Sequence, residues 1–192
     1  MEKKILKFIT LEIPYKLIRN PNITSIQLKV YEAIYLYNLL DEQFPPNRKI
    51  AETLNMSLEM FKRTIKELEA KGMCEIINHV GTTNSYMAIK YFENNSKENV
   101  ADIPSEMLIT DRLTVSELRL YQVLKSFEKM GKITPSRKKL AEYCGNLTER
   151  SICNLIKSLE NKKLIDHERN FNEIQGNTYN EYFIFDEKRW LE

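Results

Sequence analysis

The sequence predicts an α+β protein, mainly α-helical, with two tandem winged-helix domains, each made of three helices and a β-hairpin wing. Three observations predict this fold. Residues 135–165 have the pattern of two helices joined by a tight turn. A related pattern occurs about 90 residues earlier in the chain. Each copy then changes from helical periodicity to the alternating pattern of a β-hairpin.

The repeat divides the chain into a first domain at 1–92, a linker at 93–99 and a second domain at 100–192. The clearest matches are Ile13-Pro14 with Ile103-Pro104, Thr24 with Thr114, Tyr31 with Tyr121, and Ala51-Glu52 with Ala141-Glu142. The linker is polar and has no apolar periodicity. Because it is short, it should restrict how the two domains sit together.

Composition limits the classes of function. The chain has 192 residues, of which 42% are hydrophobic and 29% charged, as is usual for a globular protein. The absence of a signal-peptide pattern and of a long apolar run predicts a cytoplasmic protein with no membrane partner. The 29 Lys and Arg residues barely exceed the 27 Asp and Glu residues. A nucleic-acid partner would therefore require the basic residues to be sorted onto one face.

Each copy is expected to begin with an extended segment that ends at a proline. These segments are Phe8 to Ile13 before Pro14, and Val100 to Ile103 before Pro104. A capping box then opens a long helix, in which a hydroxyl and a side-chain carbonyl or carboxylate satisfy amides of the first turn. The boxes are Thr24 with Gln27 and Thr114 with Glu117. The helices should span about 25–40 and 115–130, with Leu28, Tyr31, Ala33, Tyr35, Leu39, Leu118, Tyr121, Leu124 and Phe127 facing the core.

A short helix and a third helix follow in each copy. Pro46 and Pro135 precede the short helix, and Asn47 and Ser136 suit its start. Residues that tolerate a left-handed backbone end this helix, and hydroxyl residues cap the next one. The stop residues are Asn55 and Gly145, and the caps are Ser57 and Thr148. The third helices should bury Phe61, Ile65 and Leu68 in one copy and Ile152, Ile156 and Leu159 in the other.

The alternating segments predict one hairpin per copy. They are Met73 to Ile77 with Ser85 to Ile89, and Leu164 to His167 with Tyr182 to Phe185. The second hairpin should be longer and contain Asn170-Phe171-Asn172. Two histidines, His79 and His167, fall near the hairpin starts without other ligands at metal-binding spacing, so we expect them to be incidental. Cys74, Cys144 and Cys153 are expected to be free thiols.

The second copy resembles a known family. The resemblance lies in Ile103-Pro104, Leu113-Thr114, Leu120-Tyr121, Pro135-Ser136, Leu140-Ala141, Leu147-Thr148-Glu149-Arg150 and Leu159-Glu160. This run is similar to the helix-turn-helix domains of phage and plasmid replication proteins and replisome organisers. The tandem arrangement is similar to plasmid replication initiators. The first copy departs from the pattern at Leu58 to Phe61.

In a winged helix, the N-terminal half of the third helix enters the major groove, while wing and cap residues meet phosphates. The candidate contacts to base edges are Glu59, Lys62 and Arg63 in the first domain and Arg150, Ser151 and Asn154 in the second. The candidate phosphate contacts are Arg48, Ser57, Lys66, Arg137, Lys138, Thr148 and Lys157. The same polar residues would also suit the solvated face of an ordinary amphipathic helix.

These patterns predict a non-enzymatic protein that binds double-stranded DNA, as a replication initiator or transcriptional regulator of a phage or plasmid. No pattern of catalytic residues, metal ligands or cofactor-binding glycines accompanies the repeat. The alternative is a protein-interaction module that binds a replication, transcription or other effector protein, which the small net charge favours. A homodimer is compatible with either function.

Overall fold

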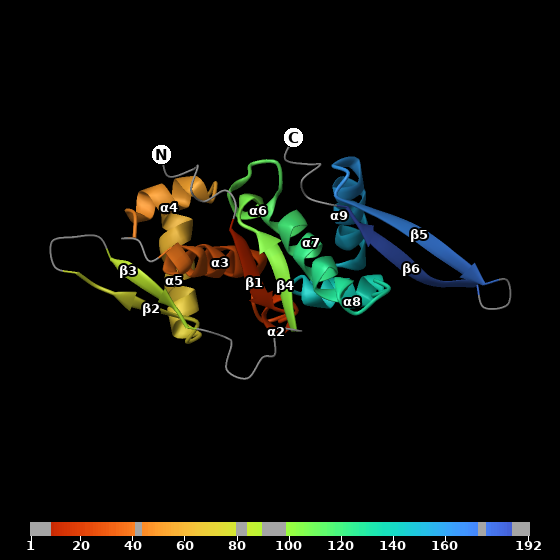
Figure 1. The fold of residues 1–192 in the computed structure, drawn as a ribbon, viewed down its shortest axis with the longest axis horizontal. Coiled ribbons are helices and arrows are strands. Elements are labelled where there is room, and N and C mark those ends of the chain that lie inside the picture. The colour runs from red at the N-terminus through yellow and green to blue at the C-terminus, as the bar shows by residue number, and fades with distance from the viewer. Residues whose placement is uncertain (1–8, 41–43, 80–83, 90–98, 173–175, 186–192) are drawn as a thin grey trace.

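The computed structural model describes residues 9–40, 44–79, 84–89, 99–172 and 176–185, with the backbone alone at 170–172 and 176–178. Within these ranges the chain is α+β and mainly helical, with eight helices and three two-stranded antiparallel sheets (Figure 1). The first half contains β1 (Thr10–Pro14), α2 (Tyr15–Ile18), α3 (Ser25–Leu40), α4 (Asn47–Thr53), α5 (Leu58–Ala70), β2 (Cys74–Ile77) and β3 (Ser85–Ala88). The second contains β4 (Val100–Pro104), α6 (Glu106–Ile109), α7 (Val115–Glu128), α8 (Arg137–Tyr143), α9 (Glu149–Asn161), β5 (Ile165–Asn172) and β6 (Gly176–Ile184).

The same order of elements occurs in both halves, as the repeat predicts. Both capping boxes are present: Thr24 exchanges hydrogen bonds with Gln27, and Thr114 does so with Glu117. The single-turn helices α2 and α6 were not expected, because four residues are too few to show helical periodicity. Helix α7 ends at Glu128, two residues earlier than expected, and Gly131 follows with φ +95°. The predicted linker at 93–99 lies outside the described residues except for Asn99.

The two extended segments, expected to open separate domains, pair with each other. Strands β1 and β4 form an antiparallel sheet in which Glu12 lies opposite Asp102, its counterpart in the repeat. The remaining pairs are Thr10 with Pro104, Leu11 with Ile103, Ile13 with Ala101, and Pro14 with Val100. The register is thus symmetric about the central pair. The two halves are therefore related by an approximate two-fold axis that passes between Glu12 and Asp102.

Helices α3 and α7 meet at the same axis. Glu32 of α3 and Gln122 of α7 are also counterparts in the repeat, and both are buried. The Gln122 Nε2 donates to the two carboxylate oxygens of Glu32 at 3.0 and 2.9 Å. A buried carboxyl group needs such hydrogen bonds, because burial without them is costly. The contact between the halves therefore contains a polar centre that apolar periodicity did not predict.

Two buried cations connect the long helices to the turns that precede the third helices. Lys29 Nζ donates to the carbonyl oxygen of Leu54 at 2.9 Å, just after α4. Its counterpart Arg119 donates through Nε to the carbonyl oxygen of Tyr143 at 3.1 Å, at the end of α8. A cation at a helix C-terminus also interacts favourably with the helix dipole. Each long helix thus positions the turn between the short helix and the third helix.

The same turns also contact the opposite half. Arg119 Nη2 donates to the carbonyl oxygen of Asn20 at 3.0 Å. Near the equivalent place, Asn55 Nδ2 donates to the carbonyl oxygen of Thr110 at 3.2 Å. Asn20 and Thr110 are themselves counterparts in the repeat. These contacts across the axis fix the third helix of each half relative to the other half.

The predicted core is largely confirmed. The six apolar residues of the third-helix stripes are all buried, as are Tyr31, Leu118, Tyr121 and Leu124. The prediction for Leu39 was wrong, because its side chain is 49% exposed. Leu39 belongs to the last turn of α3 and lines an open groove with Met87 and Ile89. Helical periodicity placed Leu39 on the core-facing side of α3, but it could not show that the neighbouring β2–β3 hairpin leaves this side chain exposed.

The stability of the protein should depend on pH through Glu32. Burial raises the pKa of Glu32 to about 8, although the hydrogen bonds from Gln122 and the nearby Arg119 and Lys29 act to lower it. An unfolded glutamate titrates near pH 4.5, so over this window the folded chain retains a proton that the unfolded chain loses. We therefore expect the unfolding free energy to fall as pH rises from about 4.5 to about 8.

Urea unfolding at several pH values across this window would measure the slope. Glu32→Gln should make the unfolding free energy less dependent on pH. The control Glu12→Gln changes an exposed carboxylate at the same axis and should keep the wild-type slope. A wild-type slope in Glu32→Gln would contradict the prediction.

Candidate nucleic-acid interface

Both third helices begin at a side-chain cap. The backbone amide of Met60 donates to Ser57 Oγ at 3.2 Å, and that of Ser151 donates to Thr148 Oγ1 at 3.1 Å. Both caps were predicted and are confirmed. They satisfy amides that would otherwise lack acceptors at the helix N-termini. Ser57 and Thr148 are therefore structural residues at the ends where DNA contact is predicted.

The turns before these helices use a left-handed backbone, as predicted. Asn55 has φ 54°, and Gly145 has φ 85°. The second turn has an additional left-handed residue, Asn146, with φ 60°. This extra residue accounts for a one-residue shift between the repeats before the third helix. An added Cβ at Gly145 would meet only the carbonyl oxygen of Ile23, at 3.9 Å, so backbone conformation rather than space favours glycine there.

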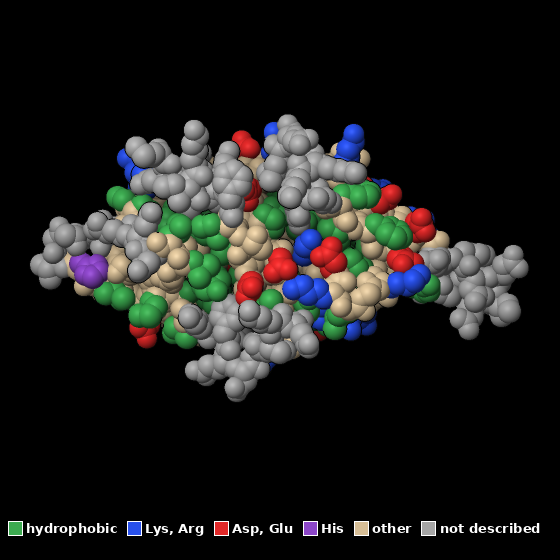
Figure 2. Space-filling model, viewed as in Figure 1, with side chains coloured by type: hydrophobic (Ala, Val, Ile, Leu, Met, Phe, Trp, Pro, Cys, Tyr) green, Lys and Arg blue, Asp and Glu red, His purple; other side chains and the backbone are tan. Residues whose placement is uncertain are grey.

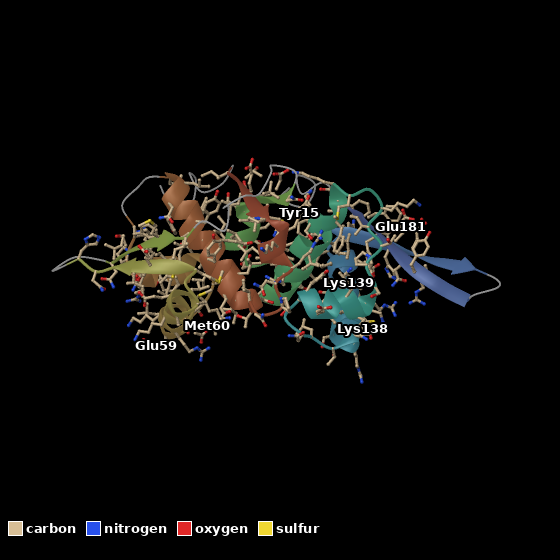
Figure 3. The ribbon with its side chains drawn as sticks, turned by 90° about the horizontal axis from the view of Figure 1, so that it is seen from below. Tyr15, Glu59, Met60, Lys138, Lys139 and Glu181 are labelled. Atoms are coloured by element: carbon tan, nitrogen blue, oxygen red, sulfur yellow. The ribbon has the colours of Figure 1, made fainter. Side chains whose placement is uncertain are left out.

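The helix pairs α4–α5 and α8–α9 lie on one side of the molecule. In Figure 3, Glu59 and Met60 at the start of α5 lie on the same side as Lys138 and Lys139 of α8, and Tyr15 lies toward the opposite side. In Figure 1, α5 runs from α4 down to β2, whereas α9 runs from α8 up to β5. In this view the third helices therefore run in opposite directions, as expected for helices that lie across a two-fold axis.

The face that carries β1 and β4 is shown in Figure 2. Lys and Arg side chains on this face lie beside Asp and Glu side chains, and hydrophobic side chains gather over its left half. No continuous basic area appears among the described residues of this face. It is thus a poor match for a polyanion.

The predicted contacts in the second half differ in accessibility. Arg150, Asn154 and Lys157 are exposed along α9, and none forms an ion pair within the described residues. Ser151 is half-buried, and its hydroxyl lies 2.8 Å from Thr148 Oγ1. Arg150 and Asn154 are therefore the most accessible groups for reading base edges.

Helix α8 supplies the other two predicted contacts of this half. Lys138 is exposed, as a phosphate contact requires. Arg137 is half-buried, and its Nε has no hydrogen-bond partner among the described residues. Its charge acts on the nearby Tyr182. Arg137 is therefore less available to a phosphate than Lys138.

The first half holds its basic residues next to acidic ones. Exposed pairs join Lys62 to Glu59 at 3.5 Å, Arg63 to Glu67 at 3.7 Å, and Arg48 to Glu52 at 3.0 Å. Lys66 is exposed on the same helix. Exposed pairs of this kind contribute about 0–1 kcal/mol each, so a phosphate could displace the acidic partners at low cost.

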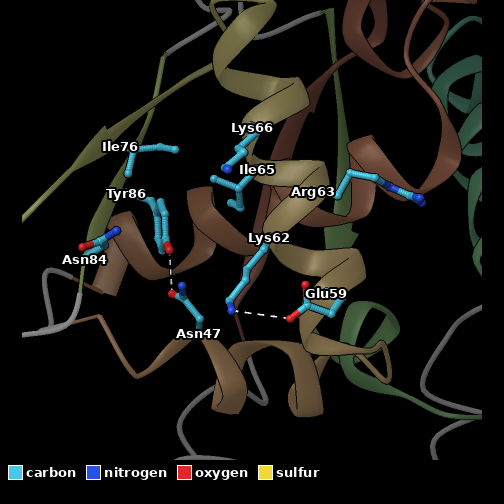
Figure 4. A pocket seen from close by; sticks show the side chains of 9 residues that line it. All are labelled: Asn47, Glu59, Lys62, Arg63, Ile65, Lys66, Ile76, Asn84 and Tyr86. Carbon is cyan, nitrogen blue, oxygen red and sulfur yellow. Dashed lines mark hydrogen bonds and ion pairs between the residues drawn. The ribbon is translucent and has the colours of Figure 1, made fainter.

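A groove of about 460 Å³ lies between α5 and the β2–β3 hairpin. Glu59, Lys62, Arg63 and Lys66 line it from the helix, and Tyr86 lines it from the hairpin (Figure 4). The Tyr86 hydroxyl donates to Asn47 Oδ1 at 2.5 Å. Asn47 therefore connects the short helix to the hairpin. Four of the six predicted contacts of the first half thus line one open groove, whereas Arg48 and Ser57 lie outside its lining.

The second half has aromatic stacking at the equivalent hairpin position. His167 stacks on the buried Tyr182 with a centroid distance of 6.0 Å, and its Nδ1 is hydrogen-bonded to Glu160.

His79, in the first half, lies 2.7 Å from Ser85 Oγ. Within the described residues, no group of three or more His, Cys, Asp or Glu side chains could hold a metal ion.

A pair of equivalent networks joins each capping box to the end of the third helix. In the first half, Gln27 Nε2 donates to Glu67 at 2.8 Å, and Lys71 Nζ donates to Gln27 Oε1 at 2.9 Å. In the second half, Lys162 Nζ contacts both carboxylate oxygens of Glu117 at 2.7 Å, and the hydroxyl of Ser158 also donates to Glu117.

The two networks take their carboxylate from different helices: Glu117 lies on the long helix α7, whereas Glu67 lies on the third helix α5. Burial acts to raise the pKa of Glu117, but hydrogen bonds from Lys162, Ser158 and Thr114 outweigh it and lower the pKa to about 2. The first network uses Glu67 of the third helix instead. Each network thus contains one carboxylate and one lysine, and it links the third helix to the long helix. Only the capping-box part of these networks was visible in the sequence.

Capping and DNA binding by Thr148 should be separable. Thr148→Ala removes the cap and should destabilise the protein by about 1 kcal/mol. Thr148→Asp keeps an acceptor at the cap and should retain stability, but its negative charge would repel a phosphate. Thermal unfolding and duplex-binding assays would measure the two effects. Equal stability of the alanine and wild-type proteins would contradict the role of the cap.

Comparison with models of known protein families gave no match, and a search of curated proteins gave no significant match. Among the described residues, no helix is both long and apolar enough to cross a bilayer.

Proposed function

We propose that this chain is a non-enzymatic double-stranded DNA-binding protein in which each half is a winged-helix domain. Helices α5 and α9 are its recognition helices, and the hairpins β2–β3 and β5–β6 are its wings. The observation that carries the proposal is the arrangement of two capped third helices, related by a two-fold axis, on one side of the molecule. Dimeric helix-turn-helix proteins present their recognition helices to successive major grooves in this way.

The exposed side chains support the same proposal. Arg150 can donate two hydrogen bonds to guanine, and Asn154 can pair with adenine through two atoms. Lys66 and Lys157 occupy equivalent exposed positions farther along α5 and α9, where they would meet phosphates. The small net charge is compatible with DNA binding if the side that carries the third helices is the basic one. The role as replication initiator or transcriptional regulator of a phage or plasmid follows from the resemblance of the second copy.

An apolar groove favours a protein partner as the second candidate. Leu39, Met87 and Ile89 are 49%, 46% and 39% exposed and line a groove of about 550 Å³ between α3 and the β2–β3 hairpin. Exposed apolar clusters of this kind often bind proteins. In this alternative, a replication or transcription protein would bind there.

Selection of bound sequences from a pool of random duplexes tests the proposed function. We expect enrichment of a motif that covers two major grooves, with centres about one helical turn apart. Affinity should fall steeply as salt rises, because each phosphate contact releases counterions. The absence of both enrichment and salt-dependent duplex binding would overturn DNA binding and favour the protein-interaction function.

A further inference from the structure

The symmetry of the chain defines how its two third helices would approach a duplex. The β1–β4 register pairs Glu12 with its counterpart Asp102, and Gln122 binds its counterpart Glu32. Both contacts join equivalent positions, as a two-fold axis between the halves requires. A two-fold axis of this kind presents equivalent groups to the two strands of a duplex in opposite directions.

Contacts across the axis make this orientation a fixed property of the chain. Arg119 reaches from α7 to Asn20 in the other half, and Asn55 reaches to Thr110 in the reverse direction. Arg19 adds a third connection, since its Nε donates to Ser126 Oγ at 2.8 Å. Because Asn55 and Arg119 adjoin the turns before α5 and α9, a change in the direction of either third helix would break their contacts.

Equivalent positions on the two third helices carry different base-reading groups. Both helices have 13 residues. Their second positions are Glu59 and Arg150, and their sixth positions are Arg63 and Asn154. A glutamate accepts from cytosine, an arginine donates to guanine, and an asparagine pairs with adenine. The ninth position is lysine in both helices, so the phosphate contact is shared while the base contacts differ.

We infer that the DNA target is an inverted repeat with two unlike halves, in which Glu59 and Arg63 determine one half and Arg150 and Asn154 the other. This inference rests on the proposed DNA-binding function. One chain would thus read two half-sites that have opposite orientations, as in a palindrome, but different base sequences. Orientation comes from the two-fold axis, and the difference between halves comes from these two pairs of positions.

Reciprocal exchange of the two pairs tests the inference. One variant carries Glu59→Arg and Arg63→Asn, and the other carries Arg150→Glu and Asn154→Arg. All four residues are exposed, so neither variant should impair folding, which thermal unfolding would verify. Each variant and the wild type would be used to select sequences from random duplexes.

The wild type should select two unlike half-sites in opposite orientations. Each variant should select a site that is palindromic at the base pairs read by the two exchanged positions, with the α9 preference repeated in the first case and the α5 preference in the second. Each should bind its own selected site about tenfold or more tightly than the wild type does, as expected for altered two-atom base contacts. Lys66→Ala and Lys157→Ala serve as controls that should weaken binding without changing the symmetry of the selected site.

Two results would overturn the inference while leaving DNA binding intact. One is selection of half-sites in the same orientation by the wild type. The other is selection of an unchanged site by both exchange variants. If no protein enriches any sequence and none shows salt-dependent duplex binding, the proposed function itself fails.

Discussion

Replacing Arg119 with alanine is expected to destabilise the protein by about 2–6 kcal/mol. The guanidinium donates to the carbonyl oxygens of Tyr143 and Asn20, one in each half. Both acceptors would lose their donor, at a cost of about 1–3 kcal/mol each. The substitution would also remove a fully buried side chain from the contact between α7 and the first half. Urea unfolding would measure the loss.

Arg119→Lys provides a matched comparison, because the counterpart of Arg119 in the first half is Lys29. Lys29 bonds the carbonyl oxygen of Leu54. A lysine at 119 should therefore keep the contact at the end of α8 and lose the contact to Asn20. Arg119→Lys should thus lower the unfolding free energy by about half as much as Arg119→Ala does. Lys16→Ala, at an exposed position on α2, should have little effect. Wild-type stability in Arg119→Ala would contradict the role assigned to this residue.

Arg150→Ala should reduce affinity for the selected duplex by about 5–150-fold. This range corresponds to the ~1–3 kcal/mol of a two-atom contact between arginine and guanine. The variant should also lose its preference at one base pair of the α9 half-site, while the α5 half-site is still read. Competition among duplexes that differ at single positions would measure both effects.

The matched comparison for Arg150→Ala is Lys157→Ala, because Lys157 is also exposed on α9. Loss of a phosphate contact should weaken binding to all duplexes alike and reduce the salt dependence by about one counterion. Unchanged affinity and unchanged base preference in Arg150→Ala would place Arg150 outside the interface.

Local patterns in the sequence predicted the local structure well. The capping box at Thr114 and the stop at Gly145 each depend on a few neighbouring residues, and both are confirmed. The stripes on the third helices were readable for the same reason, since helical periodicity marks a buried face directly. The single-turn helices escaped prediction because they are shorter than the window in which periodicity can be detected.

The candidate site was predictable as a set of exposed residues on particular helices, but not as a surface. Arg150 and Asn154 are exposed on α9 as expected. The ion pair of Lys62 with Glu59 joins two residues that were both expected to contact bases. The half-burial of Arg137 depends on packing in the folded second half, which spacing along α8 does not reveal.

The sequence by itself determined the order of elements, the duplication and the buried face of each third helix, because these depend on neighbours within a few residues. Tertiary structure alone decided that β1 pairs with β4, and that Glu32 meets Gln122 at an axis between the halves. Alternation of apolar residues shows that a strand has a buried face, but the backbone N–H and C=O groups at its edge can form hydrogen bonds with many different strands. The partner is fixed only when the chain folds and the packing of α3 on α7 brings the two segments together.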